Sequence, residues 1–185
     1  MAVLQCGSRE LDLRRPQVMG ILNVTPDSFS DGGVHNSLQL ALDHAAAMVD
    51  AGATILDIGG ESTRPGAPEV GESEEVDRVI PVIESLVGSL DVLVSVDTSK
   101  AAVIRQATAA GAGLINDVRA LQLPGAMEAA AGSQAAVCLM HMKGAPQTMQ
   151  QAPEYDDIVS EINSFLKARC TACEAVGIDR NRLMI

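Results

Sequence analysis

The chain has 185 residues, 47% of them hydrophobic, and a formal net charge of −11 at pH 7. This length suffices for one domain with a substantial core, and no apolar run reaches the about 18 residues that a membrane span needs. The first apolar stretch is short and follows no basic segment, so a signal peptide is not expected. The acidic balance argues against a nucleic-acid surface, which needs clustered Lys and Arg, but not against small anionic substrates.

The cysteines do not suggest a disulfide framework in a chain of this length. They are Cys6, Cys138, Cys170 and Cys173. The last two form a CxxC pair inside a helical pattern without a second such pair, which argues against a zinc site. We therefore expect reduced thiols in a cytoplasmic protein.

Apolar runs of strand length alternate with runs of helical period along the chain. In chain order the pattern predicts a strand at 18–22, a helix at 38–49, a strand at 54–58, a helix at 76–86, a strand at 92–96, a helix at 99–110, a strand at 113–116, a helix at 124–131, a strand at 135–140, a helix from 158 to near 177, and a strand beginning at 182–185. Asn36 or Ser37 is expected to cap the first helix, and Pro81 to kink the second or mark its start. Residues 1–15 form a lead-in.

The alternation of helices with almost wholly apolar strands predicts a parallel sheet that is covered on both faces. An open doubly wound sheet and a (β/α)8 barrel both fit, and the absence of GxGxxG after the first strand lowers the expectation of dinucleotide binding. Polar residues stand at or just beyond the ends of different strands: Asn23, Asp57, Asp97, Asn116 with Asp117, and His141. In a barrel these ends meet at one mouth, so we predict a single incomplete barrel domain with the first five βα units and the start of the sixth strand.

Residues 59–66, GGESTRPG, follow the second predicted strand. Free backbone N–H groups, hydroxyls and an arginine suit phosphate or pyrophosphate, although an ordinary Gly-rich turn with a surface arginine explains the same residues equally well. Before this segment, Asn23 offers a neutral oxygen that suits Mg²⁺ when the phosphates of a ligand supply the charge.

Asp97 and Asn116 are the strongest candidates for contact with a ligand. Thr98 or Ser99 can cap the helix that follows Asp97, which leaves Asp97 free to face the mouth. Asn116 carries donors and an acceptor that can read the edge of a heterocycle, or it can simply end a strand in a turn.

Other polar residues have a structural interpretation. His141 is expected to be partly buried and bonded to the backbone, and Asp57 and Asp117 are expected to hold loops through backbone bonds. Phe29 is different, because packing alone does not explain an aromatic side chain in this oxygen-rich loop if the loop is mobile.

Two long segments carry a family resemblance. MGILNVTPDSFSDGG (residues 19–33) and DIGGESTRPG (57–66) closely resemble the signature segments of dihydropteroate synthases, and SVDT (95–98) and INDV (115–118) follow at that family's spacing. The resemblance implies a (β/α)8 barrel. It also implies an enzyme of folate biosynthesis that joins 6-hydroxymethyl-7,8-dihydropterin pyrophosphate to para-aminobenzoate and releases pyrophosphate.

The resemblance also implies roles for particular residues. Asn23 would hold Mg²⁺ on the pyrophosphate, Thr63 would bind a phosphate oxygen, and Arg64 would lie along the pterin or near the phosphates. Asp97 and Asn116 would hydrogen-bond the pterin, and with Arg64 they form the expected catalytic set.

The apolar walls of the site follow from the same resemblance. Val118 and Met140 would line the pterin pocket. Phe29 and Pro65 would form part of the para-aminobenzoate subsite, where sulfonamides compete.

The family also carries an Asp after the sixth strand, a Lys after the seventh and an Arg-x-His segment after the eighth, none of which lies in these 185 residues. We therefore expect the chain by itself to be inactive and the full-length protein to be a homodimer, without nucleic-acid or membrane partners. The alternatives are a pterin-binding module of the methyltetrahydrofolate methyltransferase type, which handles no pyrophosphate, and a non-catalytic paralogue that keeps the barrel as a structure.

Overall fold

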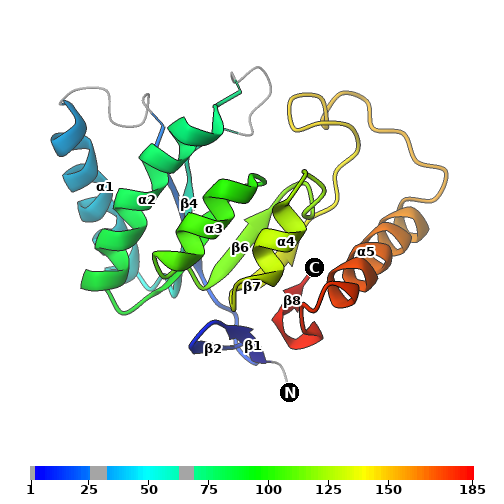
Figure 1. The fold of residues 1–185 in the computed structure, drawn as a ribbon, viewed down its shortest axis with the longest axis horizontal. Coiled ribbons are helices and arrows are strands. Elements are labelled where there is room, and N and C mark those ends of the chain that lie inside the picture. Colours follow the sequence, from blue (N-terminus) through cyan, green and yellow to red (C-terminus); the bar gives the residue numbers. More distant parts are fainter. Residues whose placement is uncertain (1–2, 26–32, 63–68) are drawn as a thin grey trace.

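The computed structural model describes residues 3–25, 33–62 and 69–185. In this part of the chain a parallel sheet is built from strands that pair in sequence order, each joined to the next by a crossover (Figure 1). The strands of the sheet are β3 (Met19–Asn23), β4 (Ile55–Gly59), β5 (Leu93–Asp97), β6 (Leu114–Asp117), β7 (Ala136–Leu139) and β8 (Leu183–Met184). The helices between them are α1 (Gly33–Asp50), α2 (Glu72–Ser89), α3 (Ala101–Ala109), α4 (Ala126–Ala131), α5 (Ile158–Ala175) and the short 3₁₀ helix η2 (Arg180–Arg182).

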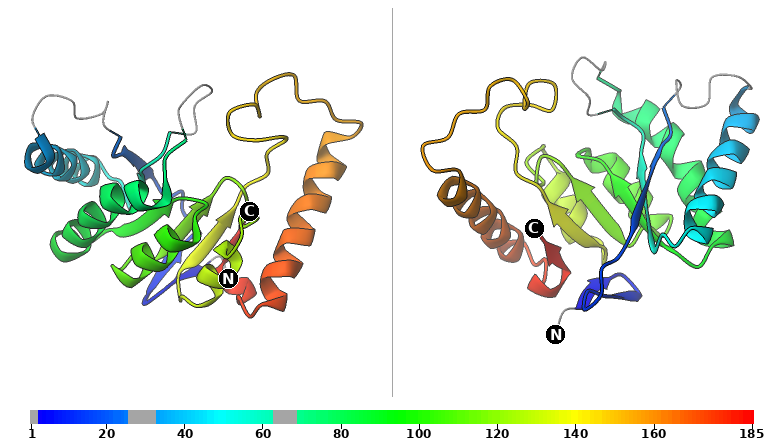
Figure 2. Two further views of the ribbon diagram at one scale, coloured as in Figure 1. Left: turned by 45° about the horizontal axis from the view of Figure 1, so that its top comes forward. Right: turned by 180° about the vertical axis from the view of Figure 1, so that it is seen from behind.

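Helices α1 to α4 cover one face of this sheet (Figure 2). Alternate strand residues, such as Leu56 and Ile58 of β4, point into this layer and are fully buried. They pack against helix residues such as Ile83 of α2 and Ile104 of α3 in one aliphatic core. The helices bury one face of the strands, and a second apolar layer, described next, covers part of the other face. This double burial explains why the strands are almost wholly apolar.

A hairpin closes the lower end of the opposite face. It consists of β1 (Val3–Cys6) and β2 (Arg9–Asp12), joined by a two-residue turn in which Gly7 has a φ of +63°. Apolar side chains from the first residues of the sheet strands and from the hairpin form a second buried cluster, namely Leu4, Cys6, Ile55, Leu93, Leu114 and Ala136. The hairpin thus covers the amino-terminal ends of the strands and leaves their carboxyl ends open.

The predicted fold class is confirmed. Alternating β and α elements form a parallel sheet whose strands neighbour one another in chain order, as in a (β/α)8 barrel, and in the described residues the barrel is not closed. The hairpin lies in the lead-in, where no element was predicted. No helix in the described ranges is long and apolar enough to cross a bilayer.

The expected cap of the first helix is wrong, and of the two alternatives for Pro81 the start of the second helix is excluded. Helix α1 begins at Gly33, so Asn36 and Ser37 lie within its first turns instead of capping it. Helix α2 begins at Glu72, so Pro81 lies in its interior and does not mark its start. An acidic first turn with Glu72, Glu74 and Glu75 stabilises the positive end of this helix dipole, which favours the earlier start.

Arg182 ties the last strand to the rest of the sheet. Its side chain is 5% exposed, and its guanidinium donates to the carbonyl of Ala135 at 2.7 and 2.9 Å and to that of Ala130 at 3.3 Å. Burial lowers the pKa of this group, and the charge of Asp179 opposes that effect.

Replacing Arg182 by methionine is expected to lower the free energy of unfolding by about 1 to 3 kcal/mol, because it leaves the buried carbonyl of Ala135 without its donor. Urea unfolding followed by circular dichroism measures the change. Arg180→Met is the matched control. Its side chain is 88% exposed, so a loss under about 0.5 kcal/mol is expected. Equal losses in the two variants would contradict the role given to Arg182.

Candidate functional site

Polar side chains gather in one row at the carboxyl ends of the strands. The register pairs Asn23 with Gly59, Gly59 with Asp97, Asp97 with Asn116 and Asn116 with Cys138. Residues paired in this way point to the same face of a parallel sheet. The predicted residues Asn23, Asp97 and Asn116 are therefore brought together on the face opposite the helices.

Gly59 lets two of these side chains approach each other. A Cβ atom at this position would lie 3.3 Å from Oδ1 of Asn23 and 3.7 Å from Oδ2 of Asp97. The distance of 3.3 Å is tighter than most Cβ contacts, so a larger residue at position 59 would crowd the amide oxygen of Asn23. Glycine therefore leaves the amide oxygen and the carboxylate near the same point on this face of the sheet.

Asp97 is in an unusual electrostatic environment. Burial raises its pKa to about 7, and the negative charges of Asp57, Asp117, Glu75 and Glu61 add to the shift. At neutral pH this carboxyl group is therefore divided between its two protonation states. A group poised in this way can accept or supply a proton at the edge of a bound heterocycle.

Asp57 does not hold a loop through backbone bonds, so that expectation is wrong. Its carboxylate is 3% exposed and accepts bonds from two side chains, Ser95 Oγ at 2.6 Å and Asn116 Nδ2 at 2.8 Å. Burial raises the pKa of Asp57, and these two hydrogen bonds oppose the increase. The bond to Asn116 makes Asp57 part of the site.

Asp117 has the expected structural role. It accepts backbone N–H groups from Arg119 at 2.8 Å and Leu121 at 2.7 Å, and the hydroxyl of Ser99 at 2.5 Å. The hydroxyl of Thr98 accepts the backbone N–H of Lys100 at 3.2 Å, at the start of α3. Lys100 is the N-cap residue of α3 and no side chain caps the helix there, so the expectation that Thr98 or Ser99 caps it is wrong. The N–H of Ala102 in the first turn instead donates to the carboxylate of Glu72 at 2.9 Å.

The two apolar residues expected around a pterin differ in their surroundings. Val118 lines a small cavity together with Asp97, Lys100 and Pro146. Met140 comes directly after β7 and is 39% exposed. The structure thus places Val118 in the same cavity as Asp97, whereas Met140 is partly exposed.

An ion cluster that was not predicted supports the loop after β4. Lys100 bonds to the carboxylates of Glu61 and Glu75, and Glu75 is 1% exposed. Glu61 also accepts the backbone N–H of Val70 at 3.3 Å. Because Glu61 and Val70 flank the segment that contains the rest of the GGESTRPG motif, this cluster fixes both ends of that segment.

His141 is half-buried, as expected, but its partners are rings. Its imidazole centroid lies 5.0 Å from that of Phe165 and 5.9 Å from that of Tyr155. Lys143 lies 4.0 Å above the Tyr155 ring. These contacts attach the long loop after β7 to helix α5.

Four predicted residues lie outside the described part of the chain. They are Phe29, Thr63, Arg64 and Pro65. Their roles stay predictions.

The surroundings of Asn23 limit how it could bind a metal ion. Its amide oxygen lies close to Gly59, and the described residues contain no group of three or more His, Cys, Asp or Glu side chains that could hold a metal ion. Mg²⁺ commonly uses one or two protein oxygens together with substrate phosphates and water. The site therefore fits Mg²⁺ only when a phosphate-bearing ligand completes the coordination.

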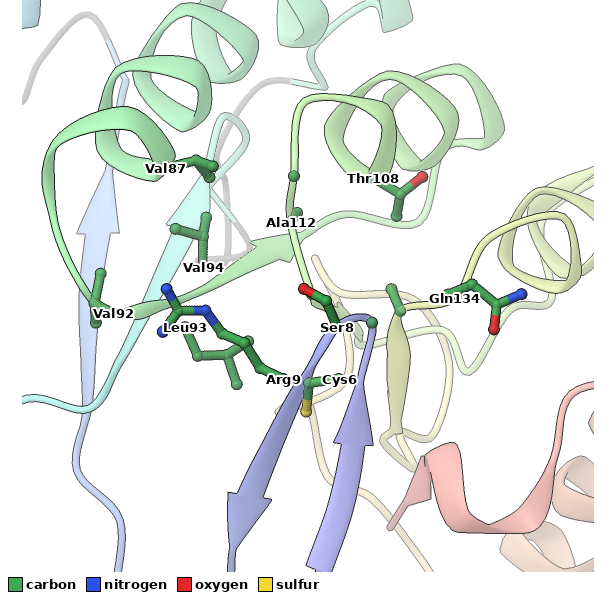
Figure 3. Close-up of a pocket in the computed structure, with 14 residues that line it drawn as sticks. Cys6, Ser8, Arg9, Val87, Val92, Leu93, Val94, Thr108, Ala112 and Gln134 are labelled. Carbon is green, nitrogen blue, oxygen red and sulfur yellow. The ribbon is translucent and has the colours of Figure 1, made fainter.

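A second cavity, of about 360 Å³, lies at the opposite end of the sheet (Figure 3). The turn of the hairpin contributes Ser8 and Arg9, and Val87, Thr108 and Gln134 come from the elements above it. Arg9 is paired with Asp91 at 2.7 Å, at an exposed position. Among the described residues that line this cavity, Gln134 supplies an amide and none supplies a carboxylate, so the cavity lacks the acid groups of the upper end.

Comparisons with known proteins agree with this geometry. Residues 19–185 match the family of pterin binding enzymes. Dihydropteroate synthase of Escherichia coli K12 is 57% identical over 175 residues, which cover 95% of this chain and 62% of that protein.

Solved structures are similar as well. Dihydropteroate synthase of Yersinia pestis in a sulfonamide drug complex has 61% identity and a TM-score of 0.91, over 98% of this chain and 66% of that one. The enzyme of Xanthomonas albilineans with 4-aminobenzoic acid has 54% identity and a TM-score of 0.89, over 98% and 64%. The chain thus spans less than two thirds of the length of these relatives. With the matched segment running from β3 to the last strand, the chain belongs to the family of pterin binding enzymes.

Proposed function

We propose that this chain carries the pterin- and pyrophosphate-binding part of a dihydropteroate synthase. The reaction of such an enzyme joins 6-hydroxymethyl-7,8-dihydropterin pyrophosphate to para-aminobenzoate. The observation that carries the proposal is the row in which Asn23, Asp97 and Asn116 lie on one face at the carboxyl ends of adjacent strands, with Gly59 between Asn23 and Asp97. The relatives and solved structures described above are named dihydropteroate synthases, which favours this function over the methyltransferase alternative.

Asp97 and Asn116 would recognise the pterin. A pterin edge presents N–H donors and ring acceptors, and an Asn amide with a neighbouring carboxyl can pair with both kinds. Val118 and Met140 would supply apolar contacts to the flat ring. Asp97, with a pKa of about 7, would match changes in protonation at the pterin during the reaction.

The pyrophosphate would lie towards Asn23 and the loop after β4. Mg²⁺ bound through Asn23 and the phosphates would neutralise the charge of the leaving group. Thr63 and Arg64 would donate hydrogen bonds to the same group. The Lys100 cluster holds the ends of the segment that carries Thr63 and Arg64.

The chemistry needs little from a base. The bond from the pterinylmethyl carbon to the pyrophosphate oxygen breaks with its electron pair on pyrophosphate, and the para-aminobenzoate nitrogen bonds to that carbon and loses a proton. The arylamine is already neutral at pH 7. The carboxylate form of Asp97 would stabilise positive charge that develops on the pterin. Phe29 and Pro65 would cover the aminobenzoate, the subsite for which sulfonamides compete.

The proposed function also bears on the cellular location and the oligomeric state. The described cysteines are free thiols, which suits a reducing compartment, and we propose the cytoplasm. The full-length enzyme would be a homodimer, which light scattering can measure directly.

Replacing Asn23 by alanine tests the proposal. We expect the chain to bind the dihydropterin pyrophosphate about tenfold more tightly with Mg²⁺ than without it, and Asn23→Ala to lose most of this increase, because the variant lacks one metal ligand. Affinity for 6-hydroxymethyl-7,8-dihydropterin, which has no phosphate, is expected to stay within about threefold. Isothermal titration calorimetry measures all of these affinities.

Asn163→Ala, at an exposed position on α5, is the matched control and should keep the full Mg²⁺ effect. Methyltetrahydrofolate is the competing ligand. Tighter binding of methyltetrahydrofolate than of the pyrophosphate ester, with no effect of Mg²⁺, would overturn the synthase proposal in favour of the methyltransferase type.

A further inference from the structure

Asp57 is a buried carboxylate without a cationic partner among the described ion pairs. It lies in the middle of β4, in register with Ile21 of β3 and Ser95 of β5, one inward-facing layer below the polar row. Its side chain is 3% exposed, and that of its partner Ser95 is fully buried. A buried charge held only by neutral donors costs folding free energy. Asp57 lies directly below the proposed ligand site, where its bond to Asn116 can serve ligand binding.

The carboxylate fixes one end of the amide of Asn116. An ionised carboxylate has acceptors and no donor, so it bonds to the NH₂ group of an amide and repels its oxygen. In the structure Nδ2 of Asn116 donates to Oδ2 of Asp57 at 2.8 Å. The opposite amide orientation would place two oxygens against each other in a buried layer, which is unfavourable.

Ser95 fixes the carboxylate in turn. Its hydroxyl donates to Oδ1 of Asp57 at 2.6 Å, so each carboxylate oxygen has a separate donor. The three side chains come from three adjacent strands, β4, β5 and β6. Their relative positions are therefore set by the sheet and do not depend on a loop.

This network decides what Asn116 offers to a ligand. With Nδ2 held by Asp57, the oxygen Oδ1 remains as an acceptor. Asp97 is the paired neighbour of Asn116 in the same row, so the two residues present their polar groups side by side.

We propose that Asp57 is a positioning residue that fixes the amide orientation of Asn116, so that the amide oxygen of Asn116 accepts an N–H group of the pterin ring. The inference rests on the proposed pterin-binding function. It assigns to Asp57 a role that acts through Asn116 and not through contact with the ligand.

The first test compares Asp57→Asn with Asp117→Asn. The two aspartates are similarly buried, but Asp117 bonds to Ser99 and to backbone N–H groups and does not bond to Asn116. An asparagine at position 57 can pair with either orientation of the Asn116 amide. Asp57→Asn should therefore weaken 6-hydroxymethyl-7,8-dihydropterin binding by about 10- to 100-fold, and Asp117→Asn by less than about threefold.

A double-mutant cycle separates positioning from general destabilisation. In an Asn116→Ala background, Asp57→Asn should change the affinity by less than about twofold, because the residue through which Asp57 acts is gone. A purely structural role of Asp57 would weaken binding equally in both backgrounds. That result would overturn the inference.

A second readout needs no ligand. In a ¹H–¹⁵N spectrum, Asn116→Ala identifies the side-chain NH₂ signals of Asn116. These signals should shift in Asp57→Asn and stay in place in Asp117→Asn, and unchanged signals in Asp57→Asn would overturn the inference. If Asp57→Asn does not fold, Ser95→Ala replaces it. This variant frees one carboxylate oxygen and should move the same signals and weaken binding by about three- to tenfold.

The two proposals fail in distinguishable ways. Absence of pterin binding by the unmodified chain would overturn the proposed function, and with it the use of Asn116 that is inferred here. Pterin binding that is equal in the unmodified chain and Asp57→Asn would leave the proposed function standing and overturn the role of Asp57.

Discussion

Replacing Lys100 by methionine is expected to lower the free energy of unfolding by about 3 to 5 kcal/mol, because it leaves a buried carboxylate without its cation. Glu75 is 1% exposed, and its charge is balanced in the structure by Lys100, which also bonds to Glu61. Burial alone would lower the pKa of Lys100, but the hydrogen bonds and charges of these two carboxylates outweigh burial and raise it. Lys100 is therefore charged over the whole neutral range.

Chemical unfolding of matched variants measures this effect. Arg14→Met removes a cation from an exposed pair with Asp12, in which the side chains are 75% and 44% exposed, so it should cost less than about 1 kcal/mol. The double variant Lys100→Met with Glu75→Gln removes the unpaired charge and should recover most of the lost stability. A double variant no more stable than Lys100→Met alone would show that the charge of Glu75 is not the cause.

Lys100→Met should also weaken ligand binding at the proposed pyrophosphate site. Glu61 loses its cation in Lys100→Met and keeps its bond to the N–H of Val70. A carboxylate without its cation beside the proposed pyrophosphate site repels phosphate, so binding of the dihydropterin pyrophosphate should weaken more than binding of the pterin alcohol. Titration of both ligands at a temperature where the variant is folded makes this comparison.

Replacing Asp97 by asparagine is expected to stabilise the fold at pH 8 while it weakens pterin binding. The pKa of Asp97 is raised by burial to about 7, whereas an unfolded aspartate titrates near 4. Below about pH 4 the group is protonated in both states and has no effect on stability. As the pH rises from 4 to 7 the unfolded state ionises first, so stability is lost over that interval and the loss is complete above pH 7.

The size of the effect follows from this interval. A difference of about three pKa units corresponds to about 4 kcal/mol at most, and partial exposure of the side chain reduces it, so we expect a gain of about 2 to 4 kcal/mol at pH 8. At pH 4 the two proteins should be within about 0.5 kcal/mol of each other.

Urea unfolding at pH 4, 6 and 8 provides the measurement. Asp77→Asn, on the exposed side of α2, serves as the control and should match the unmodified chain within about 0.5 kcal/mol at each pH. An equal gain for Asp97→Asn at pH 4 and pH 8 would rule out ionisation as its origin. Stabilisation together with lost binding is the pattern expected of a residue retained for function.

The sheet and its helices could be predicted because their signals are local. Period and length in the apolar runs place the strands within about one or two residues of their positions, as for the prediction 92–96 and the observed Leu93–Asp97. The observed strand ends one residue later than predicted, and this difference has a physical cause. The polar residue Asp97 is still paired with Asn116 of the next strand, although an aspartate at this position is typical of a loop.

The hairpin of β1 and β2 had a signal that the prediction did not use. Gly7-Ser8 separates two short runs, and a Gly-Ser pair between such runs is typical of a two-residue hairpin. Each strand has four residues, too few for a clear alternation to appear. The hairpin is stabilised by packing against the sheet, which the local sequence does not reveal.

The polar networks could not be predicted because their partners are far apart in the chain. Asp57 bonds to residues 38 and 59 positions away, and Lys100 to residues 39 and 25 positions away. Motifs and strand ends identified Asn23, Asp97 and Asn116 as neighbours. Which carboxylate faces an amide, and which faces an ammonium, depends on strand register, and register follows from the assembled sheet.

The hairpin at the base of the sheet also affects how the protein is made. Its backbone N–H at Gly7 donates to the carbonyl of Gln134 at 2.9 Å, and β1 contacts both β7 and η2. The hairpin therefore binds to residues translated much later than itself, after a delay of roughly 6 to 25 s at about 5–20 residues per second. Until then the surface that buries Leu4 and Cys6 is incomplete, because Ala136 of the same apolar cluster has not been synthesised, so the hairpin is expected to dock late in synthesis.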